Sequence, residues 1–260
     1  MKLLKPLSTL GALACLSLAA SVQANSFYVS GSYGIADIDD IDSDGTFTSD
    51  FVTGTVTGVN PPLTIPAGNA VTWDTDLDSG DSYSLAFGMR FDNFRVELEY
   101  AASSTDIDSH KNVVAAGLAL GALDAGVLIT GNVGDLGVSV ADLVAAGEGE
   151  VEVQSWFING FYDFRNDTNW VPFVGVGIGN AEIDVSYEPS NVAILDDDDS
   201  VFAYQLMAGV AYQFNEQFAV TASLRYRDYE EATLDASLLP AEFDIELDEM
   251  VYDLGVRYEF

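Results

Sequence analysis

The chain is poor in cysteine, histidine and basic residues. Its 260 residues include one cysteine, Cys15, one histidine, His110, and nine Lys or Arg against 42 Asp or Glu. A single cysteine excludes an internal disulfide framework, and a net charge of −33 disfavours binding to nucleic acid. No stretch beyond the N-terminus is a convincing transmembrane helix, because the nearest candidate, residues 113–130, contains three glycines and Asp124.

The first 24 residues have the organisation of a secretory signal peptide. A positive start, an apolar middle and a small-x-small cleavage site stand at Lys2 and Lys5, residues 7–20 and Val22-Gln-Ala24. We expect cleavage to leave residues 25–260 as one mature domain. The alternative is a lipoprotein cleaved at Cys15, for which Ala12-Leu13-Ala14 is a poor recognition sequence.

Eight segments alternate apolar and polar residues with a period of two, which is typical of β-strands with two different faces. The clearest is Met250–Phe260, where apolar or aromatic side chains occupy every second position. A blurred phase near residues 155–159 predicts a β-bulge there. The predicted strands are 26–36, 82–91, 94–102, 151–164, 170–183, 201–214, 218–226 and 250–260.

The connections between these segments alternate between short and long. Short connections fall near 92–93, 165–169 and 215–216, and long ones near 37–81, 103–149, 184–200 and 229–247. The pattern predicts an all-β fold, an eight-stranded antiparallel up-and-down transmembrane β-barrel with short periplasmic turns and four long extracellular loops. Residues 37–80, 103–149, 182–200 and 230–248 hold 29 of the 42 acidic residues, so we expect acidic loops.

Alternation alone does not say which face points inward. A soluble lipid-binding calyx buries its apolar set, whereas a membrane barrel turns that set toward lipid. Aromatic residues at both ends of the strands favour the membrane barrel. These are Phe27, Phe91, Phe94, Phe164, Trp170, Phe214, Phe218 and Phe260 near the short turns, and Tyr33, Tyr83, Tyr100, Tyr204, Tyr226 and Tyr252 toward the long connections.

The polar face carries charges of both signs. Inside a narrow barrel these charges would pair, because an unpaired buried charge is very costly. Such pairing predicts a plugged interior, with a narrow porin-like channel as the alternative. We expect Arg90, Arg95, Arg225, Arg227 and Arg257 to face Glu97, Glu99, Asp253 and Glu259.

No residue is assigned a catalytic, cofactor-binding or metal-binding role, and no cofactor is expected. Residues 40–46 match the opening of a calcium loop, but Phe51 stands where the bidentate Glu belongs, so we interpret them as a solvated acidic loop. The run Asp196–Asp199 is expected to be exposed and mobile. His110 follows Asp108 and Ser109, but a triad is a spatial arrangement, so an envelope enzyme is only an alternative.

Residues 112–147 are unusually rich in Ala, Leu, Val and Gly for a long connection. Residues 140–146 have the pattern of a short helix, with Ser139 as its N-cap and Gly147 after its end. We expect this segment to fold over the barrel mouth, to insert at the membrane surface, or to contact a partner protein. The glycines of Gly175-Val-Gly177-Ile-Gly179 are interpreted as space for bulky inward neighbours rather than as a nucleotide-binding motif.

Taken in order, five segments resemble the OmpA-type and opacity-protein-like outer-membrane β-barrel family over nearly the whole mature chain. The resemblance implies location in the bacterial outer membrane, contact with lipid and lipopolysaccharide, and recognition of the last strand and Phe260 by the barrel-assembly machinery. It also implies a non-enzymatic structural, adhesive or surface-antigen role, which we place on the acidic loops together with divalent cations. The segments are Phe27–Gly34, Pro172–Gly179, Phe202–Tyr212, Leu224–Arg227 and Tyr258–Phe260.

Overall fold

The computed structural model describes residues 26–260 except 40, 132–133, 146–148 and 189–193, so the predicted signal peptide lies outside the described residues. Most of the described chain is β-strand, and none of its helices is long and apolar enough to cross a membrane. In order, the elements are β1 (Ser26–Ile38), β2 (Ile41–Phe47), β3 (Phe51–Val52), β4 (Thr64–Ile65), β5 (Ala70–Leu77), β6 (Gly80–Phe91), β7 (Phe94–Ala115), β8 (Leu118–Ala119), the 3-10 helix η2 (Ala125–Leu128), α1 (Val140–Val144), β9 (Gly149–Asp163), β10 (Trp170–Tyr187), β11 (Leu195–Gln213), β12 (Phe218–Asp235) and β13 (Ala241–Glu259).

Eight strands form a closed antiparallel ring in the described part of the chain, as the sequence predicted. Each of β1, β6, β7, β9, β10, β11, β12 and β13 pairs with the next, and β1 closes the ring against β13. The start of β1 and the end of β13 meet at the short-turn end of the barrel. There the amide of Phe260 donates to the carbonyl of Phe27 at 2.9 Å. Closure removes the exposed strand edges that a membrane does not tolerate.

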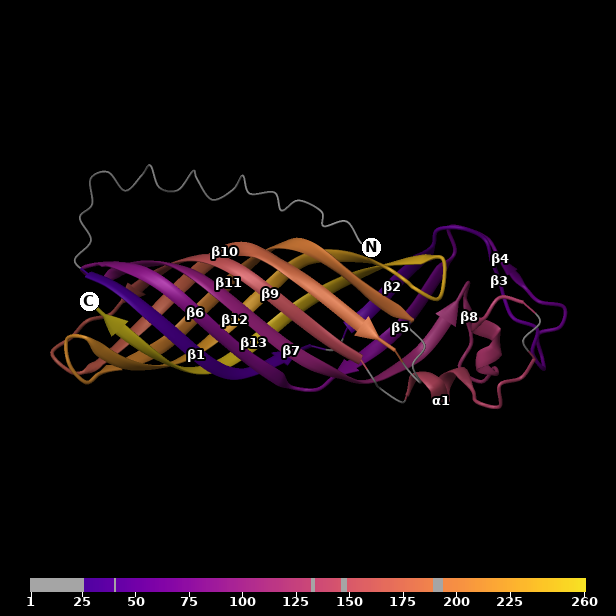
Figure 1. The fold of residues 1–260 in the computed structure, drawn as a ribbon, viewed down its shortest axis with the longest axis horizontal. Helices are drawn as coiled ribbons and strands as arrows, with labels where there is room; N and C mark the ends of the chain where they lie inside the picture. Colours follow the sequence, from indigo (N-terminus) through magenta and orange to yellow (C-terminus); the bar gives the residue numbers. More distant parts are fainter. Residues whose placement is uncertain (1–25, 40, 132–133, 146–148, 189–193) are drawn as a thin grey trace, which may run out of the picture.

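The wall of the barrel continues beyond the ends of β1 and β6. There β2 and β5 pair with each other and fill the place between β13 and β7. We call the part enclosed by β1 and β6 the lower barrel, and the part enclosed by β2 and β5 the extension. Figure 1 shows one elongated barrel, with the extension at the right and η2, α1, β3 and β4 gathered at its far end.

The extension corrects the predicted strand ends. Much of the sequence that we assigned to long loops is strand, because five ring strands run further than predicted. The connection between β12 and β13 is reduced to residues 236–240. The revised limits are Ala115 instead of 102 for β7, Tyr187 instead of 183 for β10, Leu195 instead of 201 for β11, Asp235 instead of 226 for β12, and Ala241 instead of 250 for β13.

The two halves of the barrel have opposite polarity. In the lower barrel β13 turns Asp253 and Arg257 inward and Leu254 and Val256 outward. In the extension the same strand buries apolar side chains and exposes acidic ones. The buried set is Ala241, Phe243, Ile245 and Leu247, and the exposed set is Glu242, Asp244 and Glu246. The period of two continues through the boundary while the apolar set changes face, which made the strands look shorter in the sequence.

The predicted bulge near residues 155–159 is wrong, because β9 pairs with both neighbours without a register shift. The irregularity lies instead in β12, between Tyr229 and Ala232. There Glu230 and Glu231 are both exposed, and Ala232 resumes the inward positions. Without the extra residue Glu231 would follow Tyr229 into the apolar interior, so the bulge keeps this carboxylate in solvent.

Candidate functional site

The lower barrel is filled by paired charges. Arg225 on β12 lies at the centre: its Nη1 donates to Glu99 of β7 at 2.7 Å, and its Nε donates to Asp253 of β13 at 2.6 Å. Arg227 donates to Glu249 of β13 at 2.9 Å. Glu99 lies on a strand distant from β12 and β13 in the sequence, so its ion pair with Arg225 joins opposite parts of the barrel wall across the interior.

A second cluster lies closer to the short turns. Arg95 donates from Nε to Asp163 at 3.0 Å and from Nη1 to the hydroxyl of Tyr28 at 3.2 Å. The Tyr28 hydroxyl in turn donates to Glu97 at 2.8 Å. The guanidinium of Arg95 also lies 4.2 Å from the ring centre of Phe161, within the range of a cation–π contact.

The remaining predicted arginines also point inward. Arg90 forms an ion pair with Glu259, and Nε of Arg257 lies 3.4 Å from a carboxylate oxygen of Glu259. All five predicted arginines and all four predicted carboxylates therefore contribute to the interior, as the sequence predicted. A small cavity of about 40 Å³ between Arg95 and Arg225 is the space left between the two clusters.

Several interior residues were missed in the sequence. Asn159 donates to Glu99 at 2.9 Å and accepts from Gln205 at 2.8 Å, so an amide pair links the acidic groups. Asp163 and Glu249 complete the two arginine clusters. Glu249 comes directly after the apolar inward positions of the extension, so no sequence pattern indicated that a charged inward position begins there. In β9, by contrast, every second residue points inward, and this alternation could have identified Asn159 and Asp163.

The glycines of β10 make room for these side chains, as we interpreted them. A Cβ atom on Gly175 would overlap the ring of Phe161, and one on Gly177 would overlap the side chain of Asn159. Bulkier residues at these positions would push the interior groups out of place.

The outer surface of the lower barrel is apolar and ends in two aromatic girdles. Leu254 is 68% exposed and Val176 is 60% exposed. Phe94 and Trp170 lie at the short-turn end, and Tyr252 lies toward the extension. Large exposed apolar side chains on every second position, bounded by aromatic belts, match a lipid-facing surface about one bilayer high.

The interior of the extension holds the only histidine of the chain. His110 of β7 is 5% exposed, and its Nδ1 shares a hydrogen bond of 2.7 Å with the hydroxyl of Thr75. Its ring lies 4.0 Å from that of Tyr187 and 5.9 Å from that of Trp73. Burial lowers the pKa of His110 to about 4, so the ring is neutral at pH 7.

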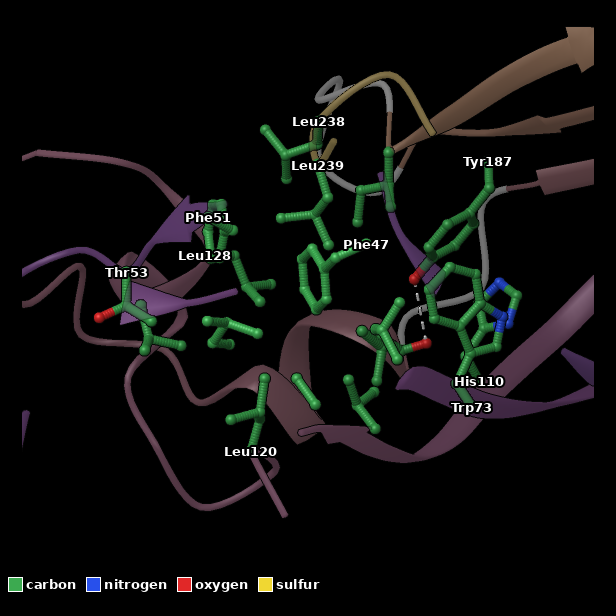
Figure 2. Close-up of a pocket in the computed structure, with 17 residues that line it drawn as sticks. Phe47, Phe51, Thr53, Trp73, His110, Leu120, Leu128, Tyr187, Leu238 and Leu239 are labelled. Carbon is green, nitrogen blue, oxygen red and sulfur yellow. Dashed lines mark hydrogen bonds between the residues drawn. The ribbon is translucent and has the colours of Figure 1, made fainter. Parts of the chain in front are cut away.

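A cavity of about 40 Å³ adjoins His110 inside the extension. Figure 2 shows Phe47 among the side chains that line it, with Trp73, His110 and Tyr187 together at one side. Most lining groups are apolar and belong to the large hydrophobic core of the extension. No sequence spacing signalled this cavity, because it arises where the β2–β5 hairpin meets residues distant in the chain.

The described residues of the segment 112–147 fold over the barrel mouth, one of the three outcomes we expected. Helix α1 covers Val140–Val144, and the Ser139 hydroxyl accepts from the amide of Asp142 at 3.1 Å, as the predicted N-cap. Val140 and Val144 are buried in the core of the extension. The predicted last residues of this helix, 146–147, lie outside the described residues.

Asp124 holds the turns of this cover together. Its carboxylate accepts from the amides of Leu136 at 2.8 Å, Gly126 at 2.9 Å and Gly137 at 2.8 Å. The hydrogen bond from Leu136, followed by the others, lowers the pKa of Asp124 below its usual value. Asp124, which interrupts an apolar stretch in the sequence, therefore stabilises the fold as a hydrogen-bond acceptor.

The acidic motifs are strands rather than loops. Asp44 is exposed on β2, so the segment does not adopt a calcium-loop conformation, and Asp40 lies outside the described residues. In β11, Asp197 accepts from the amide of Asp235 at 2.8 Å and Asp199 accepts from that of Thr233 at 3.1 Å. Asp196 and Asp198 are exposed, as expected, but the expectation of a mobile run is wrong, because the run lies in β11 and Asp197 and Asp199 tie that strand to β12. Within the described residues, no group of three or more His, Cys, Asp or Glu is placed to hold a metal ion.

A closed antiparallel ring with an apolar girdled exterior and a charged interior defines a transmembrane barrel of the bacterial outer membrane. The sequence model of the outer membrane protein beta-barrel domain family matches residues 8–260, and the chain belongs to this family. Family and location therefore agree with the resemblance found in the sequence.

Individual relatives are distant. The chain is 26% identical over 97 residues to outer membrane protein PagN of Salmonella typhimurium strain LT2, a match covering 33% of this chain and 41% of PagN. It therefore spans about two fifths of that relative. The outer membrane protein OprG from Pseudomonas aeruginosa is 16% identical with a TM-score of 0.55, over 92% of this chain and 97% of OprG. Neisserial surface protein A is 12% identical with a TM-score of 0.47, over 90% of this chain and 97% of that protein. These likenesses concern the fold alone.

Proposed function

We propose that this protein is a non-enzymatic outer-membrane barrel that holds an acidic, rigid surface above the membrane, with a structural or adhesive role. The observation that carries the proposal is the extension itself. Its outward positions are acidic while its inward positions form a continuous hydrophobic core. Charges on paired strands are held at fixed spacing, in contrast to charges on flexible loops.

The acidic wall supports contact with cationic surfaces and with divalent cations. On β13 the exposed Glu242, Asp244 and Glu246 recur at every second position, about 7 Å apart along the strand. Lipopolysaccharide phosphates lie at the same level of an outer membrane, so divalent cations between phosphate and carboxylate would reduce their repulsion. We place adhesion or surface-antigen activity on this wall.

Two further proposals concern the path of the chain to the membrane. Residues 1–24 would direct export and be removed, which leaves residues 25–260 as the outer-membrane domain. The last strand, ending at Phe260, would be recognised by the barrel-assembly machinery. Support for the second proposal comes from the exposed aromatic ring of Phe260 at the end of an alternating strand.

The filled interior argues against a porin-like role. The arginine clusters and the Asn159–Gln205 pair occupy the lower barrel, and the space between the clusters is about 40 Å³. A continuous water path would require these ion pairs to separate in a medium of low dielectric constant, which is strongly unfavourable. We expect conductance at background level in planar bilayers.

Surface accessibility tests the proposed orientation. Cleavage of the signal would remove Cys15, the only cysteine, so single-cysteine variants can be read without interference. On intact cells a membrane-impermeant maleimide should label Glu246→Cys but not Asn215→Cys in the short turn. Leu254→Cys, in the lipid-facing wall, should resist labelling. Equal labelling of Glu246→Cys and Asn215→Cys would contradict the orientation and the surface role.

A charge-neutralised variant tests the adhesive role. Cells carrying Glu242→Gln with Glu246→Gln should be retained less on a polylysine surface than wild-type cells. A matched control, Asp167→Asn with Glu216→Gln, removes two exposed carboxylates from the short turns and should leave retention unchanged. If both variants behave as wild type, the acidic wall has no adhesive role.

A further inference from the structure

The lipid-facing wall of the lower barrel contains an open groove of about 410 Å³ on β11, β12 and β13. These three strands lie side by side in the wall (Figure 1). The small outward side chains of Ala208 and Ala222 leave this space, and the exposed Tyr252 and Leu254 of β13 border it. Because hydrocarbon surrounds this part of the wall, an acyl chain can fill the groove and gain close contacts there.

Two carboxylates face outward on the same strands, on the side of the groove toward the extension. In the register of the sheet, Asp228 of β12 lies opposite Asp248 of β13, and Tyr204 of β11 lies opposite Asp228. Both carboxylates are half-buried. Like charges directly opposite each other on neighbouring strands destabilise a sheet. A bound cation would remove this unfavourable interaction.

The basic residues of these strands do not neutralise the pair, because all of them are buried in the interior of the barrel. They are Arg225, Arg227 and Arg257. The hydroxyl of Tyr226 donates to Asp228 at 3.3 Å, but it supplies no positive charge. Asp39 adds negative charge near Asp248. The cation that balances the pair therefore has to come from outside the chain.

The distance between the carboxylates and the groove fits an amphiphilic molecule. Leu224 at the groove is four residues from Asp228, and Tyr252 is four residues from Asp248. At about 3.3 Å per residue, the carboxylates lie roughly 13 Å along the strands from the groove. A lipid whose head group lies at the carboxylates therefore directs its chain into the groove.

We propose that this site binds one lipid that carries an ammonium group in its head, with the ammonium between Asp228 and Asp248 and an acyl chain in the groove. This goes beyond a surface role, since it assigns a ligand to the lipid-facing wall. A metal ion is not the cation that we infer, because the described residues contain no group of three acidic side chains placed to hold one. A second copy of the chain is disfavoured in the groove, because a net charge of −33 makes two acidic extensions repel each other.

Two tryptophan reporters allow lipid contacts on two parts of the wall to be compared. In the first protein Tyr252→Trp reports on the groove, and Trp156→Phe with Trp170→Phe removes the other exposed indoles. In the second protein the native Trp156 of β9 is the reporter, with Trp170→Phe. Trp73 is buried in the extension in both proteins. Each protein would be placed in phosphatidylglycerol nanodiscs with increasing fractions of brominated phosphatidylethanolamine, whose bromine atoms quench a tryptophan in contact with them.

The proposal predicts different lipid preferences at the two reporters. At Tyr252→Trp we expect phosphatidylethanolamine to be preferred over phosphatidylglycerol about tenfold, because its ammonium forms charge-assisted hydrogen bonds with the carboxylates. At Trp156 we expect quenching to follow the bulk lipid composition. Equal preferences at the two reporters would overturn the site, and this comparison needs no substitution of the carboxylates.

Substitution of the carboxylates tests the recognition of the head group. Asp228→Asn with Asp248→Asn should reduce the preference at the groove reporter to the value at Trp156. The matched control, Asp106→Asn with Glu152→Gln, removes two exposed carboxylates from another part of the outer wall and should leave the preference unchanged. Heat-modifiable migration on a gel would verify folding. A preference that persists in the folded Asp228→Asn, Asp248→Asn protein would overturn the role of the carboxylates.

Filling the groove tests the acyl chain separately. Ala208→Leu with Ala222→Leu places larger side chains in the groove while both carboxylates remain. We expect the preference at Tyr252→Trp to fall to the value at Trp156, because the chain can no longer lie beside the reporter. An unchanged preference in this folded variant would overturn the binding of the chain in the groove.

Discussion

Arg225 and Glu99 face each other across the lower barrel, with Nη1 of the arginine 2.7 and 2.8 Å from the two carboxylate oxygens. The residues are 126 positions apart in the chain. Both are buried, and Asp253 holds the same guanidinium from a third strand. The pair thus joins β7 to β12 and β13 through the interior as well as through the hydrogen bonds of the wall.

Removing the arginine should strongly destabilise the barrel. Arg225→Met leaves Glu99 and Asp253 with buried negative charge that is no longer balanced by this guanidinium. We expect the free energy of unfolding in urea to fall by about 3–5 kcal/mol. Lys111→Met is the matched control, because its ion pair with Asp76 is partly exposed and should contribute at most about 1 kcal/mol. Equal effects of the two substitutions would contradict the proposed role of the interior network.

His110 should titrate far below an ordinary histidine. Because it is the only histidine in the chain, one labelled imidazole signal reports its state by NMR. We expect a midpoint at a pH of about 4, since burial lowers its pKa to that value. A midpoint near the usual value of about 6.5 would show that the ring is hydrated.

The same depressed pKa has a consequence for stability. Between pH 6.5 and 4 the unfolded chain takes up a proton that folded His110 does not, so stability falls as the pH falls through this window. Below about pH 4 both states are protonated and the loss is complete, at a total of about 3 kcal/mol. The change in unfolding free energy between pH 7 and pH 4 would be measured for the wild type and for His110→Phe. The difference between the two changes is the contribution of His110.

A charged side chain on the outer surface of the extension should cost little folding free energy, whereas one on the outer surface of the lower barrel should cost much more. Leu254 lies between Tyr252 and Tyr258 on the lipid-facing side of β13, whereas Glu246 is exposed on the extension of the same strand. Leu254→Arg should cost about 2–4 kcal/mol of folding free energy in lipid vesicles, and Glu246→Arg should cost little. Similar costs for the two would contradict the assigned membrane boundary.

One seam in the wall should exchange its amide hydrogens rapidly. Pairing of β13 with β1 ends at Glu249 and pairing with β2 begins at Asp244, so residues 245–248 have no described strand partner on that side. Successive backbone amides point to alternate neighbours, so two of these four amides face the seam. We expect them to be much less protected than amides of residues 251–258 in hydrogen-exchange NMR. Uniform protection along β13 would show that the seam is closed in solution.

The ring, its exterior and most of its interior charges could be predicted because all depend on a period of two. Arg95 and Leu98 lie on opposite faces as strand parity requires, and a narrow barrel leaves charged inward residues no partners except one another. The upper strand ends could not be predicted in the same way. Between Glu249 and Leu247 the inward residues change from charged to apolar, so a search for one constant apolar face stops there.

Other features depend on contacts that no local pattern contains. Glu231 is kept outside by a bulge whose reason is the apolar interior formed by other strands. His110 of β7 lies between Thr75 and Trp73 of β5 and Tyr187 of β10, which are distant from it in the sequence. Asp108 and Ser109 precede His110 in the sequence, but the contacts of its ring are with side chains of β5 and β10.

The change from an apolar outer surface in the lower barrel to an acidic one in the extension also fixes the depth of the protein in the bilayer. Movement outward would lift Tyr33, Tyr83 and Tyr252 from the outer headgroup region into water, and movement inward would draw Glu246 and Asp244 into hydrocarbon. Both displacements raise the free energy, so the extension stands at a constant height above the outer leaflet. In a thinner or thicker membrane the lipid would have to adjust to the protein.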